Sequence, residues 1–461
     1  MNMISNHLPT EELQALDAAH HLHPFTAGDE LAAKGVRVIT KANGVTLTDS
    51  DGKEMLDAMA GLWCVNIGYG RDELAEAAYA QMKQLPYYNT FFQTTHVPAI
   101  SLAKQIADLA PGDLNHVFFA SSGSEANDTN IRLVRHYWAA QGKPDKKVII
   151  SRTNAYHGSS MGSGSLGGMS AMHAQGGLPI ADISHIGQPN WYAEGGDMDP
   201  DEFGLIRARE LEAKIEELGE DKVAAFIAEP IQGAGGVIIP PESYWPEIQR
   251  ICDAHEILLI ADEVITGFGR TGHWFGSQAL NIRPDIMTIA KGVTSGYLPL
   301  GGSIVSDPVA AVINGAGDFN HGYTYSGHPV ACAVALENLR ILAEEKIVER
   351  VHDVTGPYLA AKWATLADHP LVGEARSYGM VATLSLTPDK AARANFANAG
   401  AVGTRCRDAC FDNGLVMRAV GDRMIISPPL VISPDEIDTL VDRAHRAIDT
   451  AYGWAKSEGM L

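Results

Sequence analysis

Three charged side chains stand directly after short apolar runs of the sequence. Glu229 follows VAAFIA, Asp262 follows ILLIA and Lys291 follows IMTIA. Runs of this length without charges are typical of parallel strands that are covered on both faces. Because ligands of an open α/β sheet bind outside the carboxyl ends of its strands, we expect the three side chains to face one crevice. One such charge alone is usually a solvated strand end, whereas three together favour a functional site.

Lys291 has the clearest chemical use of the three. An ammonium at the end of a buried strand is partly desolvated, which lowers its pKa from about 10.4 and exposes an amine nucleophile. Asp262 precedes it by roughly 30 residues, about one β-α-β step, and so belongs to a neighbouring strand end. A carboxylate there can hydrogen-bond a protonated pyridine nitrogen, as carbanion chemistry on pyridoxal phosphate requires. A simple salt bridge of Lys291 to Asp262 or Glu229 is the alternative interpretation.

A phosphate site is expected where Ser122, Gly123 and Ser124 follow the apolar run VFFA and lead into a helix through 130–140. Backbone N–H groups at a helix N-terminus, together with serine hydroxyls, bind phosphate well. An ordinary serine N-cap would have the same local sequence. The segment therefore predicts a phosphate site only in combination with Lys291 and Asp262.

The segment Gly162–Gly167 formally matches the fingerprint G-x-G-x-x-G of dinucleotide-binding folds. It does not directly follow a strand, and no clear amphipathic helix begins from it, although the fingerprint requires both. We therefore reject a dinucleotide site and predict a flexible glycine-rich loop.

Composition narrows the class of protein further. The 461-residue chain has a formal net charge of −21, which disfavours binding to the phosphate backbone of nucleic acids. It has five cysteines and no C-x-x-C pair, so we expect neither a disulfide framework nor a bound metal. The N-terminus lacks the pattern of a signal peptide, and no apolar run approaches the ~18 residues that a membrane helix needs. These features predict a cytoplasmic protein without a membrane partner.

Alternation of apolar runs and helical segments predicts a large α/β domain over 71–330, with a mostly parallel, doubly wound sheet. Strands and helices then mix, which predicts a smaller α+β domain over 331–461. We expect the N-terminal segment 1–70 to join this smaller domain. The final helix is expected to begin at Ser433, where Ser-Pro-Asp-Glu forms a capping box with proline at the first helical position.

Several motifs in order resemble the class III, or omega, aminotransferases of the fold-type I pyridoxal-phosphate enzymes, over nearly the whole chain. The motifs are SSGSEAND, AYHG, AEPIQGAGG, ADEVITGFGRTG, IAKGVTSGYLPLGG and YTYSGHP. The resemblance implies that Lys291 forms the Schiff base with pyridoxal phosphate and moves the proton between substrate and cofactor. It implies that Asp262 pairs with the pyridine nitrogen.

The resemblance also assigns further residues to the cofactor. They are Ser122, Gly123, Ser124, Tyr156, His157, Glu229, Val264 and Thr324. Tyr156 and Val264 match the residues on the two faces of the ring, and Glu229 matches the carboxylate near the phenolic oxygen. Thr324 matches a residue that reaches the phosphate of the partner subunit. A homodimer or homotetramer with shared active sites follows from that last match.

A narrower resemblance concerns the substrate. GLWCVNIGYG and VMRAVGDRMIISPPLVIS are similar to segments of amine:pyruvate transaminases, including those acting on diamines and polyamines. In that group Trp63 would line the substrate pocket, and Arg418 would pair with the carboxylate of a keto acid and swing away from an uncharged amine substituent. Phe92 is expected to add an apolar wall, and Tyr156 is expected to contact the substrate as well as the cofactor.

We therefore predict a ping-pong omega-transaminase that moves an amino group from a diamine, polyamine or omega-amino acid to a keto acid, namely pyruvate. Another pyridoxal-phosphate reaction on the same scaffold, such as that of an aminomutase or a decarboxylase, would need the same lysine and aspartate. A non-catalytic binding protein that retains the fold is the alternative from a different class. The sequence does not distinguish the candidate amines from one another.

Overall fold

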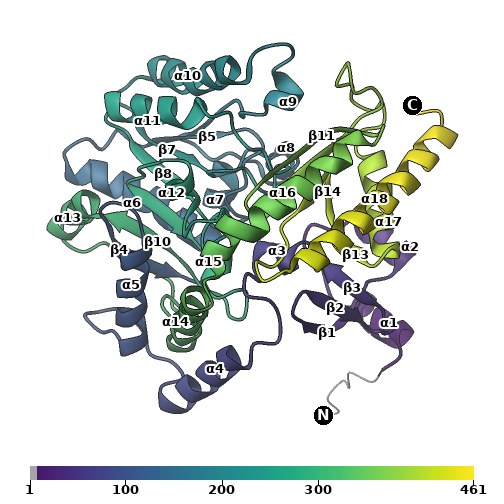
Figure 1. The fold of residues 1–461 in the computed structure, drawn as a ribbon. Coiled ribbons are helices and arrows are strands. Elements are labelled where there is room, and N and C mark those ends of the chain that lie inside the picture. The colour runs from purple at the N-terminus through teal and green to yellow at the C-terminus, as the bar shows by residue number, and fades with distance from the viewer. Residues whose placement is uncertain (1–7) are drawn as a thin grey trace.

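A seven-stranded mixed sheet forms the centre of the larger part of the molecule (Figure 1). The structure is a computed structural model that describes residues 8–461. The order of strands in the sheet is β4-β10-β9-β8-β7-β5-β6. Their bounds are β4 (Leu114–Ala120), β5 (Val148–Arg152), β6 (Ile183–Ile186), β7 (Val223–Ala228), β8 (Leu258–Asp262), β9 (Ile286–Ile289) and β10 (Gly301–Ser306).

The predicted mostly parallel α/β sheet is confirmed, with one difference. Strands β5 to β9 pair in parallel with their neighbours, whereas β10 is antiparallel to both β4 and β9. The apolar run 302–305 lies within β10, and its composition resembles that of the parallel strands. Direction cannot be read from a short apolar run, because a strand buried on both faces has the same composition in either orientation.

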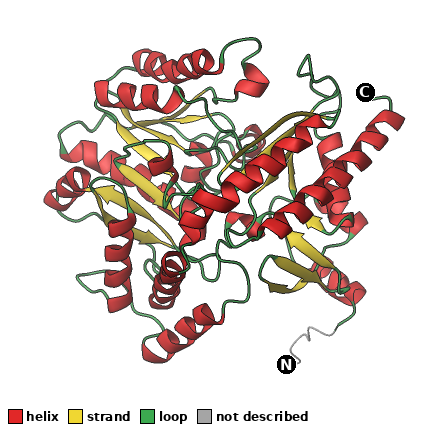
Figure 2. Ribbon diagram, viewed as in Figure 1, coloured by secondary structure: helices red, strands yellow, loops and turns green. Residues whose placement is uncertain are grey.

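Helices cover both faces of this sheet (Figure 2). Every residue of β7 is buried; Ile227 packs with α6 and α13 on one face, and Phe226 packs with α10 and α11 on the other. The helices of this part are α4 (Asp72–Gln84), α5 (Val97–Leu109), α6 (Gly123–Ala140), α7 (Met161–Leu166), α8 (Ser170–Gly176), α9 (Trp191–Glu194), α10 (Pro200–Leu218), α11 (Tyr244–Ala254), α12 (Gly276–Ala279), α13 (Asp307–Gly315) and α14 (Pro329–Glu344).

Two four-stranded sheets form the rest of the molecule. One has the order β1-β2-β3-β13 and the other β11-β12-β15-β14. The strands are β1 (Ile39–Asn43), β2 (Thr46–Asp49), β3 (Glu54–Asp57), β11 (Val372–Tyr378), β12 (Val381–Leu386), β13 (Leu415–Val416), β14 (Arg418–Val420) and β15 (Arg423–Ile426). Because β13 pairs with β3, the two ends of the chain share a sheet. The three-part division at residues 70 and 330 stays a prediction.

Shorter helices and one long helix accompany these sheets. They are α1 (Thr10–His20), α2 (Gly28–Lys34), α3 (Ala60–Trp63), α15 (Ile347–Arg350), the π-helical η2 (Val351–Thr355), α16 (Gly356–Ala364), α17 (Ala401–Asp412) and α18 (Pro434–Ser457), with 3-10 turns η1 (Lys291–Val293) and η3 (Thr365–Asp368). The capping box predicted at Ser433 is confirmed, since the Ser433 Oγ accepts from the Glu436 N–H and the Glu436 carboxylate accepts from the Ser433 N–H. Among the described residues no helix is long and apolar enough to span a bilayer.

The prediction of a flexible loop at Gly162–Gly167 is wrong. The segment forms α7, capped by Ser160, and its residues Ser163 to Leu166 are buried. A Cβ on Gly162 would stand 2.4 Å from the Asp128 Oδ1, so glycine here permits close packing against α6. The glycines therefore serve helix packing, which a composition of small residues does not distinguish from loop flexibility.

A buried arginine ties the larger part of the chain to the segment after α3 and to loops of the β11-β12-β15-β14 sheet. Arg270 donates to the Asn66 Oδ1 at 2.8 Å, to the Met380 carbonyl at 3.3 Å and to the Pro428 carbonyl. Burial lowers the pKa of its guanidinium to about 9. An arginine held by neutral oxygens alone is costly to bury, and the bonds to three separate segments offset that cost.

Candidate active site

A cavity of about 360 Å³ lies where the carboxyl ends of β8 and β9 meet the N-terminus of α6. Strands β8 and β9 are parallel neighbours, so the residues that follow them in the chain emerge at the same edge of the sheet. Eight of the predicted site residues line this cavity: Ser122, Gly123, Ser124, Tyr156, His157, Asp262, Val264 and Lys291.

Lys291 begins a 3-10 turn directly after β9 and has a positive φ of 46°. Burial lowers the pKa of its ammonium, against the opposing effect of the nearby Asp262 and Glu229 carboxylates. Within the described residues no carboxylate lies at ion-pair distance from its Nζ, so the salt-bridge interpretation is wrong for this structure. The result is an amine that loses its proton more readily than an exposed lysine does.

Asp262 is held by partners other than Lys291. Its Oδ2 accepts from the Asn127 Nδ2 at 2.8 Å and lies 2.7 Å from the His157 Nδ1, while its Oδ1 accepts from the Val264 N–H at 3.1 Å. A carboxylate has about four acceptor positions, so Asp262 retains capacity for a further donor in the cavity. The carboxylate is thereby fixed in direction and remains available to a ligand.

The N-terminus of α6 forms one wall of the cavity. Ser122 is the N-cap, and its Oγ accepts from the Glu125 N–H at 3.2 Å. The first N–H groups of a helix have no partner inside it, so those of Gly123 and Ser124 are available to an anion. The Ser124 Oγ, which accepts from the Ser159 N–H at 3.1 Å, holds the neighbouring loop against this wall.

Tyr156 and Val264 face the cavity from different segments. The Val264 side chain lies against Gly123, where an added Cβ would come within 2.9 Å of its Cγ2. The Tyr156 hydroxyl is 3.0 Å from the Ser159 Oγ, and the Phe25 ring of the N-terminal arm lies 6.4 Å from the Tyr156 ring. An aromatic residue and a branched aliphatic residue in the same cavity suit a flat, ring-shaped ligand.

Glu229 lies behind the cavity wall and is only 3% exposed. Its Oε2 has no hydrogen-bond partner among the described residues, and its Oε1 accepts from the Gly233 N–H at 3.4 Å. Burial raises the pKa of this carboxyl to about 7, a direction opposed by His157 and reinforced by Asp262. An unpartnered carboxyl of this kind is suited to donate or accept one proton near neutral pH.

Trp63 and Arg418, two of the residues assigned to substrate recognition, are placed differently. Trp63 is 2% exposed and packs in a cluster that includes Ile231 and Val381, and its indole N–H has no partner among the described residues. Arg418 is half-buried on β14 and close enough to Lys291 and Tyr156 for their charges to interact. Burial lowers the pKa of the Arg418 guanidinium, which has no hydrogen-bond or ion-pair partner within residues 8–461.

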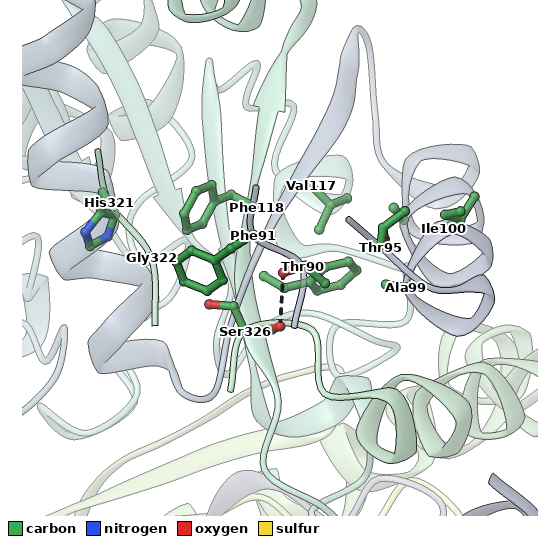
Figure 3. Close-up of a pocket in the computed structure, with 12 residues that line it drawn as sticks. Thr90, Phe91, Thr95, Ala99, Ile100, Val117, Phe118, His321, Gly322 and Ser326 are labelled. Carbon is green, nitrogen blue, oxygen red and sulfur yellow. Dashed lines mark hydrogen bonds between the residues drawn. The ribbon is translucent and has the colours of Figure 1, made fainter. Parts of the chain in front are cut away.

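Phe92 and Thr324 do not reach the Lys291 cavity of their own chain. Phe92 is 93% exposed, and the Thr324 carbonyl accepts from the Tyr87 hydroxyl at 2.6 Å. Nearby residues, Phe91 and Ser326, line a second cavity of about 340 Å³, in which the Thr90 Oγ1 donates to the Ser326 carbonyl at 3.3 Å (Figure 3). The expectation that Phe92 forms an apolar wall is therefore wrong for the cavity of its own chain, whereas the family resemblance already assigned Thr324 to the phosphate of the partner subunit.

Sequence reasoning assigned no role to several residues of the site. Asn127 is fully buried on α6 and bonds to Asp262, and its signal is a polar residue one helical turn after the N-terminal glycine. Cys64, Thr294 and Leu298 line the cavity, and all three lie within the quoted motifs, near Trp63 or Lys291.

The residues present fit pyridoxal phosphate. Lys291 offers an amine for the aldehyde, Asp262 a carboxylate for the pyridine nitrogen, and the α6 N-terminus an anion site for the phosphate. Tyr156 and Val264 are placed for the ring.

Comparisons with known proteins agree with this chemistry. The family model described as aminotransferase class-III matches residues 30–448. The chain is 62% identical to the putrescine–pyruvate aminotransferase of Pseudomonas aeruginosa, over 97% of this chain and 98% of that one. It is 44% identical to the diaminobutyrate–2-oxoglutarate transaminase of Halomonas elongata, over 96% of each chain.

Solved structures show the same architecture. A thermostable (S)-enantioselective omega-transaminase from Thermomicrobium roseum superposes with a TM-score of 0.93 at 44% identity, covering 96% of this chain and 98% of that one. The omega transaminase of Pseudomonas jessenii in complex with PMP gives a TM-score of 0.94 at 40% identity, covering 96% of this chain and 99% of that one.

We expect Glu229 to make the cofactor-free protein less stable as pH rises. Its folded-state pKa of about 7 lies above the ordinary value of 4.5, so the folded protein binds more protons between these values and loses stability across that range. The change should be about 3 kcal/mol. Melting temperatures between pH 4.5 and 7 should therefore fall in wild type relative to Glu229→Gln. Glu242→Gln, at an exposed glutamate, is the control; parallel curves for Glu229→Gln and wild type would contradict the assignment.

Proposed function

Because the chain belongs to the class-III aminotransferases, we propose that its amine donor is a short diamine such as putrescine and that its acceptor is pyruvate. The protein is a pyridoxal-phosphate-dependent omega-transaminase that moves an amino group from an amine to a keto acid. The identity of 62% to a putrescine–pyruvate aminotransferase supports the choice of donor and acceptor. The observation that carries the site assignment is the unpaired Lys291 amine next to an Asp262 that is bonded elsewhere.

The chain's own residues perform distinct tasks in this reaction. When bound, pyridoxal phosphate supplies an aldehyde for amine exchange and a ring that withdraws electrons from the substrate carbon. Lys291, with its lowered pKa, acts as the base that removes the proton from the substrate carbon and later returns it. Asp262 would hold the pyridine nitrogen in its protonated form, and Glu229, with a pKa raised to about 7 by burial, would be available to hold a proton near the phenolic oxygen.

Arg418 provides the means to accept two kinds of substrate in turn. Its guanidinium is half-buried and has no partner within residues 8–461, so a keto acid carboxylate can pair with it without breaking a salt bridge there. An amine without a carboxylate needs no such partner. Cys64 lines this space directly after Trp63 and would limit the size of the donor, with the buried Trp63 side chain packed behind it.

We further propose that the enzyme is a homodimer, or a multiple of it, with shared active sites. Exposed aromatic residues gather around Thr324: the Tyr87 and Tyr325 rings are 5.8 Å apart, and Phe92 is 93% exposed. Apolar surface of this kind marks an interaction site. A second copy covering it would bring Phe92 and Thr324 to the partner's Lys291 cavity.

We also propose that the enzyme works in the cytoplasm. All five cysteines are free, and four of them are buried. Unpaired thiols are typical of proteins from reducing compartments.

Lys291→Ala should abolish formation of alanine from pyruvate and putrescine while leaving the fold intact. Loss of the proton-transferring amine should reduce turnover by about 10⁴-fold or more. Alanine production and the circular dichroism spectrum are the measurements, and Lys456→Ala, at an exposed lysine, is the control. Release of carbon dioxide from an amino acid, without alanine, would indicate a decarboxylase instead. Normal turnover of Lys291→Ala would contradict the assignment.

Arg418→Ala should raise the KM for pyruvate by about 10- to 100-fold, because a charged hydrogen-bonded pair is lost. The KM for putrescine should change far less, since the diamine has no carboxylate. Steady-state kinetics with each substrate varied in turn provide the test. Arg376→Ala, in strand β11 at the opposite edge of the same sheet, should leave both constants unchanged. Equal increases for both substrates would rule out selective carboxylate binding.

Phe92→Asp together with Tyr325→Asp should dissociate the dimer, since two buried charges would be placed in an apolar interface. The mass in solution, measured by light scattering, should fall to that of one chain, and turnover should fall with it. Val354→Asp, at a 51% exposed apolar residue outside this surface, should leave the mass unchanged. A wild-type monomer with full turnover would disprove the shared site.

A further inference from the structure

The backbone that carries Lys291 is held in an unfavourable conformation. Lys291 and Ser295 have φ angles of 46° and 49°, a region that L-residues other than glycine rarely adopt. The hydrogen bonds inside this turn are long: 3.2 Å from the Ser295 N–H to the Gly292 carbonyl and 3.3 Å from the Thr294 N–H to the Lys291 carbonyl. Such conformations persist only where the surrounding structure imposes them. The turn therefore needs a partner from outside.

That partner is Asn338, on helix α14. Its Nδ2 donates to the carbonyls of Gly292 and Val293, both at 2.9 Å, and its Oδ1 accepts from the Ser295 Oγ at 2.7 Å. The Ser295 Oγ in turn accepts from the Ile67 N–H at 3.2 Å. Three hydrogen bonds from one side chain thus hold both halves of the 291–295 turn.

Packing alone does not explain why an asparagine occupies position 338. It is fully buried, and the other buried residues of α14 are apolar, apart from Cys332. A buried amide costs free energy unless its donors and acceptor are bonded, and here the turn supplies those bonds. For packing alone, a leucine would serve at this position.

We propose that Asn338 is a positioning residue, which fixes the strained 291–295 turn and thereby the direction in which Lys291 presents its amine. The inference rests on the role of Lys291 proposed above. Asn338 does not line the cavity and acts only through the Lys291 backbone. Without it, the Gly292 and Val293 carbonyls each lose one donor, and the turn relaxes toward ordinary dihedral angles. The amine then moves relative to Asp262.

The test uses Asn338→Leu, which keeps a similar volume and removes all three hydrogen bonds. In the holoenzyme we expect kcat to fall by about 10- to 100-fold with little change in the KM for the amine, since misplacement of a reacting group has effects of this size. Two readouts are independent of turnover. The pH midpoint of the bound cofactor's visible absorbance should move by roughly half a unit or more, and the cofactor-free protein should capture added pyridoxal phosphate more slowly.

Two further variants show whether the hydrogen bonds are the cause. Asn338→Asp retains the acceptor but places an oxygen against two carbonyls, so only its protonated form can donate, and its kcat should recover partly as pH falls. Ser295→Ala removes one bond of the three and should give a smaller shift in the same direction. Ser295→Ala also tests the proposal if Asn338→Leu does not fold.

Leu342→Ala is the matched control, because Leu342 lies one helical turn further along α14, is fully buried and has no bond to the turn. It should lower the melting temperature without moving the absorbance midpoint. The proposal is overturned if Asn338→Leu and Ser295→Ala keep the wild-type midpoint and kcat, or if Leu342→Ala moves both equally. An inactive wild type would instead refute the proposed function, which distinguishes the two failures.

Discussion

Lys291 must stay close to two carboxylates without forming a salt bridge to either, and much of the site follows from this constraint. Asp262 has the Asn127 Nδ2, the His157 ring and the Val264 N–H as hydrogen-bond partners. Its carboxylate is therefore stabilised without an ion pair to the Lys291 ammonium. Glu229 satisfies the same constraint differently, because burial raises its pKa to about 7 and removes much of its charge near neutrality. The two carboxyl groups therefore offset only part of the desolvation of Lys291, and the pKa of its ammonium falls.

The two carboxyl groups differ in their hydrogen-bond partners and in the effect of burial. Asp262 accepts from the Asn127 Nδ2 and the Val264 N–H and faces the His157 ring, which fixes the direction of its carboxylate. Glu229 accepts one long hydrogen bond, and one of its oxygens has no partner in the described part of the chain. Neighbouring parallel strands carry both groups to the same edge of the sheet, and burial raises the pKa of Glu229 to about 7. The surroundings of a carboxyl group, rather than its residue type alone, therefore set its chemical use.

Much of this site could be predicted from the sequence because its main residues directly follow buried strands or begin a helix. Asp262, Lys291 and Ser122 are marked in this way, and the family motifs add Tyr156 and Val264. The antiparallel direction of β10 and the helix at 161–166 were not predictable, since short apolar runs and small residues have the same composition in either structure. The role of Asn127 could have been predicted, because the residue lies in the quoted motif SSGSEAND and one turn into α6.

The role of Asn338 could not be predicted from the sequence. Asn338 lies more than 40 residues after Lys291, in a helix whose sequence looks simply apolar, and its role depends on how α14 packs against the turn. The residues proposed to recognise the substrate depend on similar long-range contacts, since Arg418 comes from β14 and Trp63 from a turn near the other end of the chain. The proposed reacting groups and the groups proposed to select the amine therefore occupy separate elements. Loops and the smaller sheets can change without disturbing the strand ends, so one reaction can be combined with different donors.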